Sequence, residues 1–451
     1  MELFAEQALL PSGWARNVRL TIAADGTFSK VLSDTSANTA TRLSGPLLPG
    51  MPNLHSHAFQ RAMAGLAEVL GDPQDSFWSW RQSMYALVSR VTPEQMQAIA
   101  AYLYVEMLKA GYTTVAEFHY LHHDRNGRPY ANPAETSERL MAAADVAGIG
   151  QTLMPVLYSY SGFGAQPPNQ GQQRFVQNTD AYAELWQALS AGYRQRPRHH
   201  LALCLHSLRA VAPRQLGPIL DLDDTVPVHI HIAEQQREVD ACLAWSGQRP
   251  VEWLYRHAPV DARWCLVHAT HLTSAETTLI AESGAVAGLC PTTEANLGDG
   301  LFPAMDYLAA GGRFGIGSDS HVSVSVVEEL RWLEYTQRLV SQRRNRLVSA
   351  ETPSVGRYLY ERALGGGAQA MGQPVGRIEP GAYADFIVLD GEHPMLATAD
   401  GDGLLDRWLF SGDSAMVRDV YVSGKQVIEA GRHARDAALA DDFRKALSAL
   451  R

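Results

Sequence analysis

Apolar and polar positions follow two different periodic patterns along this chain, and the first pattern is found near its two ends. Residues 18–22 alternate and are followed by an Ala-Asp-Gly turn, and residues 381–390 and 417–428 have the same character. A period of two is typical of β-strands that bury one face, and Gly and Asp mark the turns between them. We therefore expect residues 1–48 and 376–451 to pair into one small, discontinuous β-sandwich domain.

In the middle of the chain, short apolar runs alternate with amphipathic helical segments. One such helix is predicted over 93–110, where Thr92 can cap the start, Pro93 suits the first position and Gly111 ends the helix. This alternation is typical of a parallel sheet covered by helices. The candidate strands end near His57, Tyr120, Tyr158, His206, Glu234, His271, Thr293 and Asp319. Eight such units predict an α/β fold over residues 49–375, a (β/α)8 TIM barrel with insertions.

The composition indicates a compact protein that binds neither nucleic acid nor a membrane. Of 451 residues, 46% are hydrophobic and 19% charged, and the net charge of −10 leaves no basic stripe for phosphates. The chain has neither a basic and apolar leader nor an apolar run of roughly 20 residues, so we expect a cytoplasmic protein. The four cysteines are scattered, which favours buried thiols over disulfides or a structural zinc cluster.

Histidines and an acid stand where several of these strands end. His55 and His57 are two positions apart, so both imidazoles leave a strand on the same side. His231 and Asp319 end two further strands, and barrel strands bring their C-terminal ends to one mouth. The sequence therefore predicts that His55, His57, His231 and Asp319 bind one divalent metal ion, for which Zn²⁺ is the first choice.

The alternative for any single histidine of this group is an ordinary core residue. His229 lies on the same strand face as His231, so spacing alone does not choose between them. We prefer His231 as the ligand because it is closer to the mouth and is followed by Glu234. His229 is then a polar residue deeper in the barrel.

A metal of this kind needs neighbours that move protons. Zinc lowers the pKa of a bound water to roughly 7, and Glu234 could then carry a proton to a leaving nitrogen. His268 and Asp319 could orient or deprotonate the water. The alternative for Glu234 is an ordinary surface carboxylate without a catalytic role. The only lysines are Lys30, Lys109, Lys425 and Lys445. A carbamylated lysine bridging two metals is thus impossible in the later barrel strands, which favours a single ion.

The same stretches resemble the amidohydrolase superfamily. The resemblance rests on Pro-Gly-Met-Pro-Asn-Leu-His-Ser-His over 49–57, His-Ile-Ala-Glu over 231–234, the lone His268, and Ser-Asp-Ser-His over 318–321. Residues 376–390 are similar to the returning strand segment of the same superfamily. His-x-x-Glu without the bridging lysine resembles the mononuclear deaminase branch, which implies hydrolysis of a C=N group with release of ammonia.

Four further stretches are similar to the formimidoylglutamate deiminases of bacterial histidine degradation, namely 55–65, 78–81, 117–123 and 206–211. This resemblance implies a zinc enzyme, a homodimer, that converts N-formimidoyl-L-glutamate and water to N-formyl-L-glutamate and ammonia. A glutamate derivative carries two carboxylates, and arginines can bind carboxylates bidentately. The candidate substrate-binding residues are Gln60, Arg81, Tyr120, His206 and Arg209. The alternative is that Arg81 and Arg209 are solvated surface residues and that Tyr120 only packs in the core.

Two other functions are compatible with parts of this pattern. A deaminase of a nucleobase or another cyclic amidine would use the same metal ligands, but it needs a flat, largely apolar pocket, and the paired arginines speak against that. A non-catalytic barrel homologue would have lost ligands, whereas every expected ligand is present here.

Overall fold

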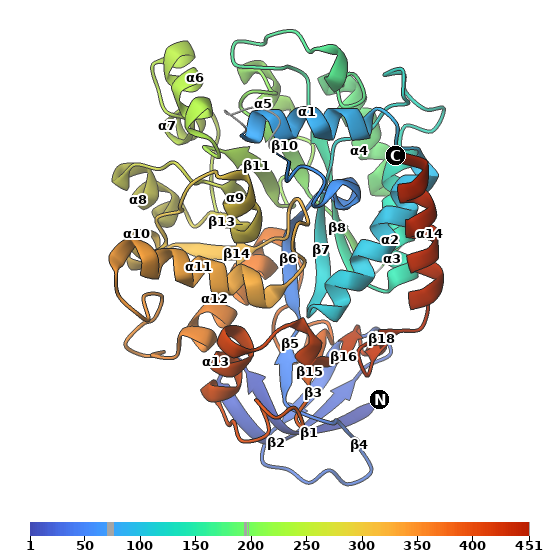
Figure 1. Cartoon of the computed structure of the whole chain (residues 1–451), viewed down its shortest axis with the longest axis vertical. Helices are drawn as coiled ribbons and strands as arrows, with labels where there is room; N and C mark the ends of the chain where they lie inside the picture. Colours follow the sequence, from blue (N-terminus) through green and yellow to red (C-terminus); the bar gives the residue numbers. More distant parts are fainter. Residues whose placement is uncertain (70–75, 194–195, 197, 451) are drawn as a thin grey trace.

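The computed structural model describes residues 1–69, 76–193, 196 and 198–450, and it contains two large sheets (Figure 1). One sheet comes from the middle of the chain and the other from its two ends. In the described part of the chain, none of the helices combines the length and apolarity that a membrane span requires. The two sheets and their connections decide where the candidate site lies.

Eight parallel strands of the middle segment form the barrel, in the order of the chain. They are β6 (Met51–Ser56), β7 (Tyr112–His119), β8 (Gly150–Leu157), β10 (Leu203–Ser207), β11 (Val228–Ile232), β12 (Trp264–His268), β13 (Val286–Leu289) and β14 (Arg313–Ile316), with the short β9 (His199–Leu201) beside β8. The barrel closes just beyond β14, where Asp319 N–H donates to the carbonyl of His55 at 3.1 Å and His57 N–H donates to that of Asp319 at 3.2 Å. The predicted (β/α)8 barrel is confirmed.

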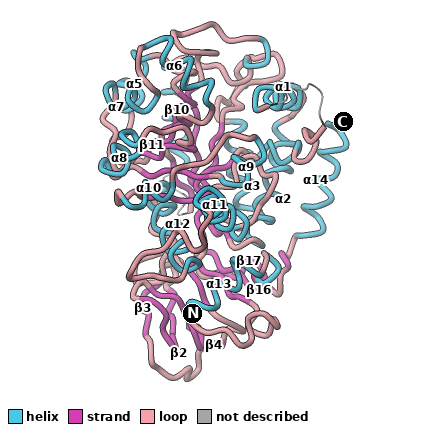
Figure 2. The backbone as a smooth tube through the Cα atoms, turned by 60° about the vertical axis from the view of Figure 1, so that its left-hand side comes forward, coloured by secondary structure: helices cyan, strands magenta, loops and turns pink. Residues whose placement is uncertain are grey.

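The helices surround these strands, as Figure 2 shows. They are α1 (Phe77–Val88), α2 (Pro93–Lys109), α3 (Glu135–Ala147), α4 (Thr179–Tyr193), α5 (Pro213–Leu220), α6 (Gln236–Ser246), α7 (Pro250–His257), α8 (Ser274–Ser283), α9 (Pro291–Leu297), α10 (Ala304–Ala309), α11 (Val326–Ser341) and α12 (Val355–Met371), with the 3-10 helices η1 (Ala58–Met63) and η2 (Gln170–Gln172). The helix predicted over 93–110 is α2, and Thr92 caps it by accepting a hydrogen bond from Gln95 N–H.

One predicted strand end was wrong. β13 ends at Leu289, and Thr293 lies in α9, because Pro291 starts a helix immediately after the strand. The other predicted ends lie within three residues of the ends of their strands.

The second sheet joins both ends of the chain. Its strands are β1 (Glu2–Leu10), β2 (Gly13–Ile22), β3 (Phe28–Leu32), β4 (Thr41–Arg42), β5 (Leu47–Pro49), β15 (Phe386–Leu389), β16 (Val417–Val422), β17 (Lys425–Glu429) and β18 (Arg432–His433). β5 connects the two halves, because it pairs with β1 on one side and with β15 on the other. Leu3, Leu20, Phe28 and Phe386 belong to its buried apolar core.

The C-terminal segment also contains helices that the strand pattern did not predict. α13 (Asp402–Ser411) and the 3-10 helix η3 (Ser414–Met416) precede β16, and α14 (Asp436–Leu450) ends the described chain. α14 packs on the barrel helix α2, where Lys109 Nζ lies 2.6 Å from an Asp436 carboxylate oxygen and the rings of Tyr102 and Phe443 stack at 4.7 Å. The last segment therefore contacts the barrel as well as the sheet.

Two glycines allow close contacts that shape the barrel. Gly50 is the single residue between β5 and β6, and a Cβ there would lie 2.2 Å from Cγ2 of Thr113. On α12, a Cβ on Gly366 would lie 1.9 Å from the carbonyl oxygen of Phe314 in β14. Only glycine permits these approaches of backbone to strand.

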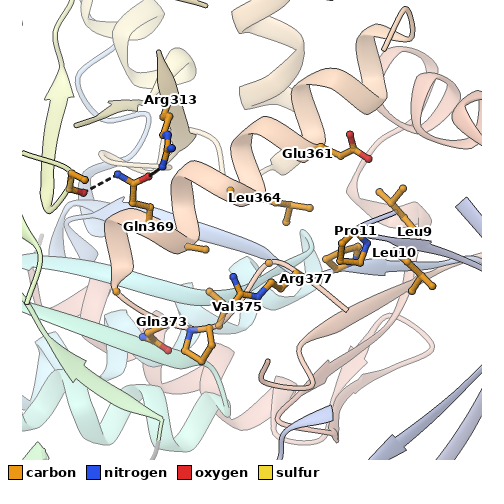
Figure 3. Close-up of a pocket in the computed structure, with 17 residues that line it drawn as sticks. Leu9, Leu10, Pro11, Arg313, Glu361, Leu364, Gln369, Gln373, Val375 and Arg377 are labelled. Atoms are coloured by element: carbon orange, nitrogen blue, oxygen red, sulfur yellow. Dashed lines mark hydrogen bonds between the residues drawn. The ribbon is translucent and has the colours of Figure 1, made fainter. Parts of the chain in front are cut away.

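A cavity of about 750 Å³ lies between α12 and the turn from β1 to β2 (Figure 3). Arg313 lines it and donates to Gln369 Oε1 at 2.7 Å, and Gln369 Nε2 donates to the carbonyl of Ala262 at 2.8 Å. Arg313 begins β14, whereas Asp319 follows the other end of that strand. This cavity is therefore at the opposite end of the barrel from the predicted ligands.

Candidate functional site

The four predicted metal ligands come together at the C-terminal mouth of the barrel. Nε2 of His55 lies 3.1 Å from Nε2 of His57 and 3.0 Å from Nε2 of His231. A carboxylate oxygen of Asp319 lies 3.4 Å from His55 Nε2 and 3.3 Å from His57 Nε2. His229, by contrast, contacts the carbonyl of Ala370 at 2.7 Å, deeper in the barrel.

The hydrogen bonds of these rings fit a bound cation. His57 Nδ1 donates to the carbonyl of Phe118 at 2.9 Å, and His231 Nδ1 donates to that of His206 at 3.0 Å. Each bond fixes the tautomer that leaves the Nε2 lone pair free, as in metal-binding histidines. Burial lowers the pKa of His55 to about 3 and also lowers the pKa values of His57 and His231. Three neutral imidazoles and one carboxylate thus offer the donors of a tetrahedral zinc site.

Glu234 and His268 stand beside this ligand group. His268 Nε2 lies 3.6 Å from Glu234 Oε1 and 4.0 Å from Asp319 Oδ2, and its Nδ1 lies 3.3 Å from Glu294 Oε1. Burial opposes the charged form of His268, but Glu234, Glu294 and Asp319 together raise its pKa to about 10. Burial raises the pKa of Glu234. The pair can therefore hold and move protons next to the predicted metal.

Several of these residues have strained backbones. Ala233, His268 and Asp319 have φ angles of 51°, 69° and 43°, in the left-handed region that favours glycine. Such conformations persist where the surrounding structure holds them, often at functional sites. Here they lie at or just beyond the ends of β11, β12 and β14.

The predicted substrate-binding residues line one cavity together with three of the four predicted metal ligands. Its walls include Gln60, Arg81, Tyr120, His206, Arg209, His57, His231, Glu234, His268 and Asp319. Gln60 Nε2 donates to the hydroxyl of Tyr120 at 3.1 Å, and the rings of Tyr158 and His206 lie 4.5 Å apart. α1 contributes Phe77, Trp80 and Met84 to the wall. The cavity therefore combines an apolar side with polar groups.

The two arginines have unused donors. Among the described residues, Nε of Arg81 and Nε of Arg209 are buried without a hydrogen-bond partner. Arg81 stacks over Trp78 at 4.5 Å, while Arg209 lies 3.8 Å from Glu234 Oε2 and 4.0 Å from Glu238 Oε2. A buried guanidinium with a free N–H is suited to an anionic ligand.

The structure also brings in acids that sequence reasoning missed. Asp299 is 3% exposed and can place a ligand atom within 4.8 Å of Glu234 and His268. Glu294 contacts His268, and Glu117 accepts hydrogen bonds from the Ser56 hydroxyl at 2.6 Å and from Ala58 N–H at 2.7 Å. A signal existed for Asp299, which lies between two glycines just after α9. Glu117 lies within β7, two residues before its end at His119, and a single acid in a buried strand did not by itself indicate a role in the site.

Comparison with known proteins gives two family matches and several relatives. Residues 47–427 match the amidohydrolase family, and residues 2–45 match the N-terminal domain of formimidoylglutamate deiminase HutF. A formimidoylglutamate deiminase of Pseudomonas aeruginosa is 61% identical over 449 residues, which cover 99% of each chain. A 5-methylthioadenosine/S-adenosylhomocysteine deaminase of Natronomonas pharaonis is 26% identical, over 95% of this chain and 92% of that protein.

Solved structures agree with this assignment. The crystal structure of an amidohydrolase from Brucella melitensis superposes with a TM-score of 0.95 at 49% identity, over 100% of this chain and 99% of that one. An adenosine deaminase from Xanthomonas campestris with bound zinc shares the fold, with a TM-score of 0.83 at 22% identity over 100% of this chain and 98% of that chain. The resemblance inferred from the motifs is confirmed, and the chain belongs to the amidohydrolase family, in its formimidoylglutamate deiminase branch.

Proposed function

We propose that this protein hydrolyses N-formimidoyl-L-glutamate to N-formyl-L-glutamate and ammonia, a step of histidine degradation. The observation that carries the proposal is the pair of arginines, Arg81 and Arg209, whose Nε atoms are buried without a hydrogen-bond partner among the described residues, in the same cavity as metal ligands. A substrate with two carboxylates needs such donors. The 61% identity to a formimidoylglutamate deiminase supports the same substrate.

His55, His57, His231 and Asp319 would hold one divalent ion, with zinc favoured by their donor set. Such an ion supplies Lewis acidity and makes a water nucleophilic near neutral pH. The chain's own residues then direct the reaction. Arg81 and Arg209 bind the carboxylates, and Gln60, Tyr120 and His206 are placed to hydrogen-bond the rest of the substrate.

Proton transfer completes the reaction. The water oxygen adds to the formimidoyl carbon, the bond from that carbon to the terminal nitrogen breaks, and both water protons end on the nitrogen that leaves as ammonia. In this proposal Glu234 protonates that nitrogen, Asp319 orients the water, and His268 as an imidazolium stabilises developing negative charge; the raised pKa of His268 and its 3.6 Å distance to Glu234 support these roles.

The test is an ammonia-release assay with the zinc-loaded protein. We expect turnover of N-formimidoyl-L-glutamate and none of guanine, cytosine or adenosine, because a flat nucleobase cannot use two buried guanidiniums. Preferential release of ammonia from a nucleobase would refute the proposal and favour the cyclic amidine alternative. A protein that retains no metal and turns over none of these compounds would be a non-catalytic homologue.

A further inference from the structure

Asp299 is a buried acid close to Glu234 and His268, and the mechanism above does not use it. It lies between Gly298 and Gly300, whose φ angles are 67° and 133°. A Cβ on Gly300 would lie 3.2 Å from Cγ2 of Thr270, so the turn needs glycine on this side. The loop after α9 is thus shaped to bring a carboxyl group into the site.

The contacts of Asp299 tie it to the residue next to Glu234. One carboxylate oxygen accepts a hydrogen bond from the side-chain amide of Gln235, and its backbone carbonyl accepts one from His271 Nε2 at 2.7 Å. The other oxygen, Oδ2, is buried and has no hydrogen-bond partner in the part of the chain that the structure describes. An unpaired oxygen this deeply buried is costly, so it calls for a proton or a partner.

The charges around Asp299 favour a proton. It faces the carboxylates of Glu234, Glu294 and Asp319 and the imidazolium of His268. Burial, with the charge of Glu234 next in size, raises the pKa of Asp299 to about 9. Two carboxyl groups less than 5 Å apart in a buried site do not both ionise near neutral pH. Burial and like charge therefore favour one proton shared by Glu234 and Asp299, although the cations His268 and Arg209 lower the pKa of Glu234.

We propose that Asp299 is a positioning residue that retains a proton on the Glu234–Asp299 pair, so that Glu234 meets the substrate nitrogen as an acid. This inference rests on the proposed deimination. The pair gives its proton to the formimidoyl nitrogen, and one of the two water protons replaces it when the second reaches the ammonia. The pair is thus restored after each turnover, and no other reactant is needed.

The test compares pH profiles of the zinc-loaded enzyme. Asp299→Asn keeps the shape and the acceptor for Gln235 but removes the ionisable neighbour, so Glu234 should lose its proton at a lower pH. We expect the alkaline fall of kcat to move down by about one pH unit and kcat at pH 8 to fall by up to about 10-fold, with KM within about 3-fold of wild type. The matched control is Asp306→Asn, at an exposed position on α10, which should change neither the pH profile nor kcat nor KM.

A second variant should move the profile in the opposite direction. Gln235→Met removes the amide that stabilises ionised Asp299, so the alkaline fall of kcat should move to higher pH. Profiles of Asp299→Asn and Gln235→Met that both superimpose on that of the wild type would overturn the inference. Opposite shifts support it, and they cannot come from a general loss of stability.

A titration that does not need turnover separates this inference from the proposed function. Carboxyl carbon NMR of the zinc-loaded protein, labelled at Asp and Glu, should contain one aspartate signal that titrates above pH 7 and is missing from Asp299→Asn. If the wild type releases no ammonia from N-formimidoyl-L-glutamate, the proposed function fails, whereas the titration still decides on Asp299. A spectrum without such a signal would overturn the shared proton.

Discussion

Glu234 lies between two cationic side chains, His268 at 3.6 Å and Arg209 at 3.8 Å. Glu234→Gln keeps the size of the side chain but removes the proton carrier, and it touches none of the four predicted ligands. We expect zinc to stay bound and kcat to fall about 1000-fold. Metal analysis and ammonia release on the same sample check this. Ammonia release near the wild-type rate would rule out Glu234 as the acid.

Arg209 tests recognition of the substrate separately from chemistry. Arg209→Ala removes a buried guanidinium from the cavity, so we expect KM for the acidic substrate to rise about 10- to 100-fold, with a smaller change in kcat. The matched control is Arg214→Ala, five residues on, whose exposed guanidinium contacts the hydroxyl of Tyr160. Steady-state kinetics of both variants decide the point, and an unchanged KM in Arg209→Ala would exclude a carboxylate clamp.

At this scale, the sequence predicted side chains whose position follows from strand geometry. His55 and His57 share a strand face, and the ends of parallel strands converge, so their meeting with His231 and Asp319 could be expected. Asp299 could not be placed in this way, because a loop with two positive φ angles brings it in. The contacts of Arg209 with Glu234 and Glu238 depend on side-chain packing, so they could not be predicted from the sequence either. The roles of all these residues stay predictions until variants are measured.

Among the elements, α12 makes the closest approach to the barrel, and its three consecutive glycines allow a matched stability test. Gly366→Ala places a methyl group against the carbonyl of Phe314, so we expect a loss of about 1 to 3 kcal/mol in the free energy of unfolding. Gly365→Ala faces open space and should stabilise the helix by up to about 1 kcal/mol. Thermal or denaturant unfolding checks both. Equal effects would show that close packing does not explain Gly366.

Element types followed from the sequence wherever the pattern was long and regular. α2 was predicted almost to the residue because Thr92, Pro93 and its buried apolar positions all agree. The strand end at Thr293 was wrong because an apolar run does not show where a strand gives way to a helix. α14 was missed because its position depends on a distant surface of α2. The division of the chain at residues 48 and 376 stays a prediction.

For the whole molecule, metal removal should affect both activity and stability. Without a cation, Nε2 of His55 lies about 3 Å from Nε2 of His57 and of His231, next to the carboxylate of Asp319. We expect a chelator to abolish ammonia release and to lower the melting temperature by about 5 °C, with both restored by zinc. His231→Asn is the control, because a protein that has lost a ligand should melt early with or without chelator. A wild-type melting curve that the chelator leaves unchanged would contradict the predicted site.

At the same scale, the homodimer stays a prediction from resemblance. Light scattering of the purified protein should give about twice the 49.4 kDa of one chain. A mass of one chain at all concentrations would contradict it.

The single residue between β5 and β6 has a consequence for engineering. The strand that presents His55 and His57 starts where the terminal sheet stops, and that sheet is itself completed by β15 from the far end of the chain. The barrel strand that carries the first two donors is therefore joined directly to the terminal sheet. Replacing the N-terminal segment with that of another family member would change the support of the strand that carries these metal ligands. The terminal segments and the barrel therefore have to be exchanged together.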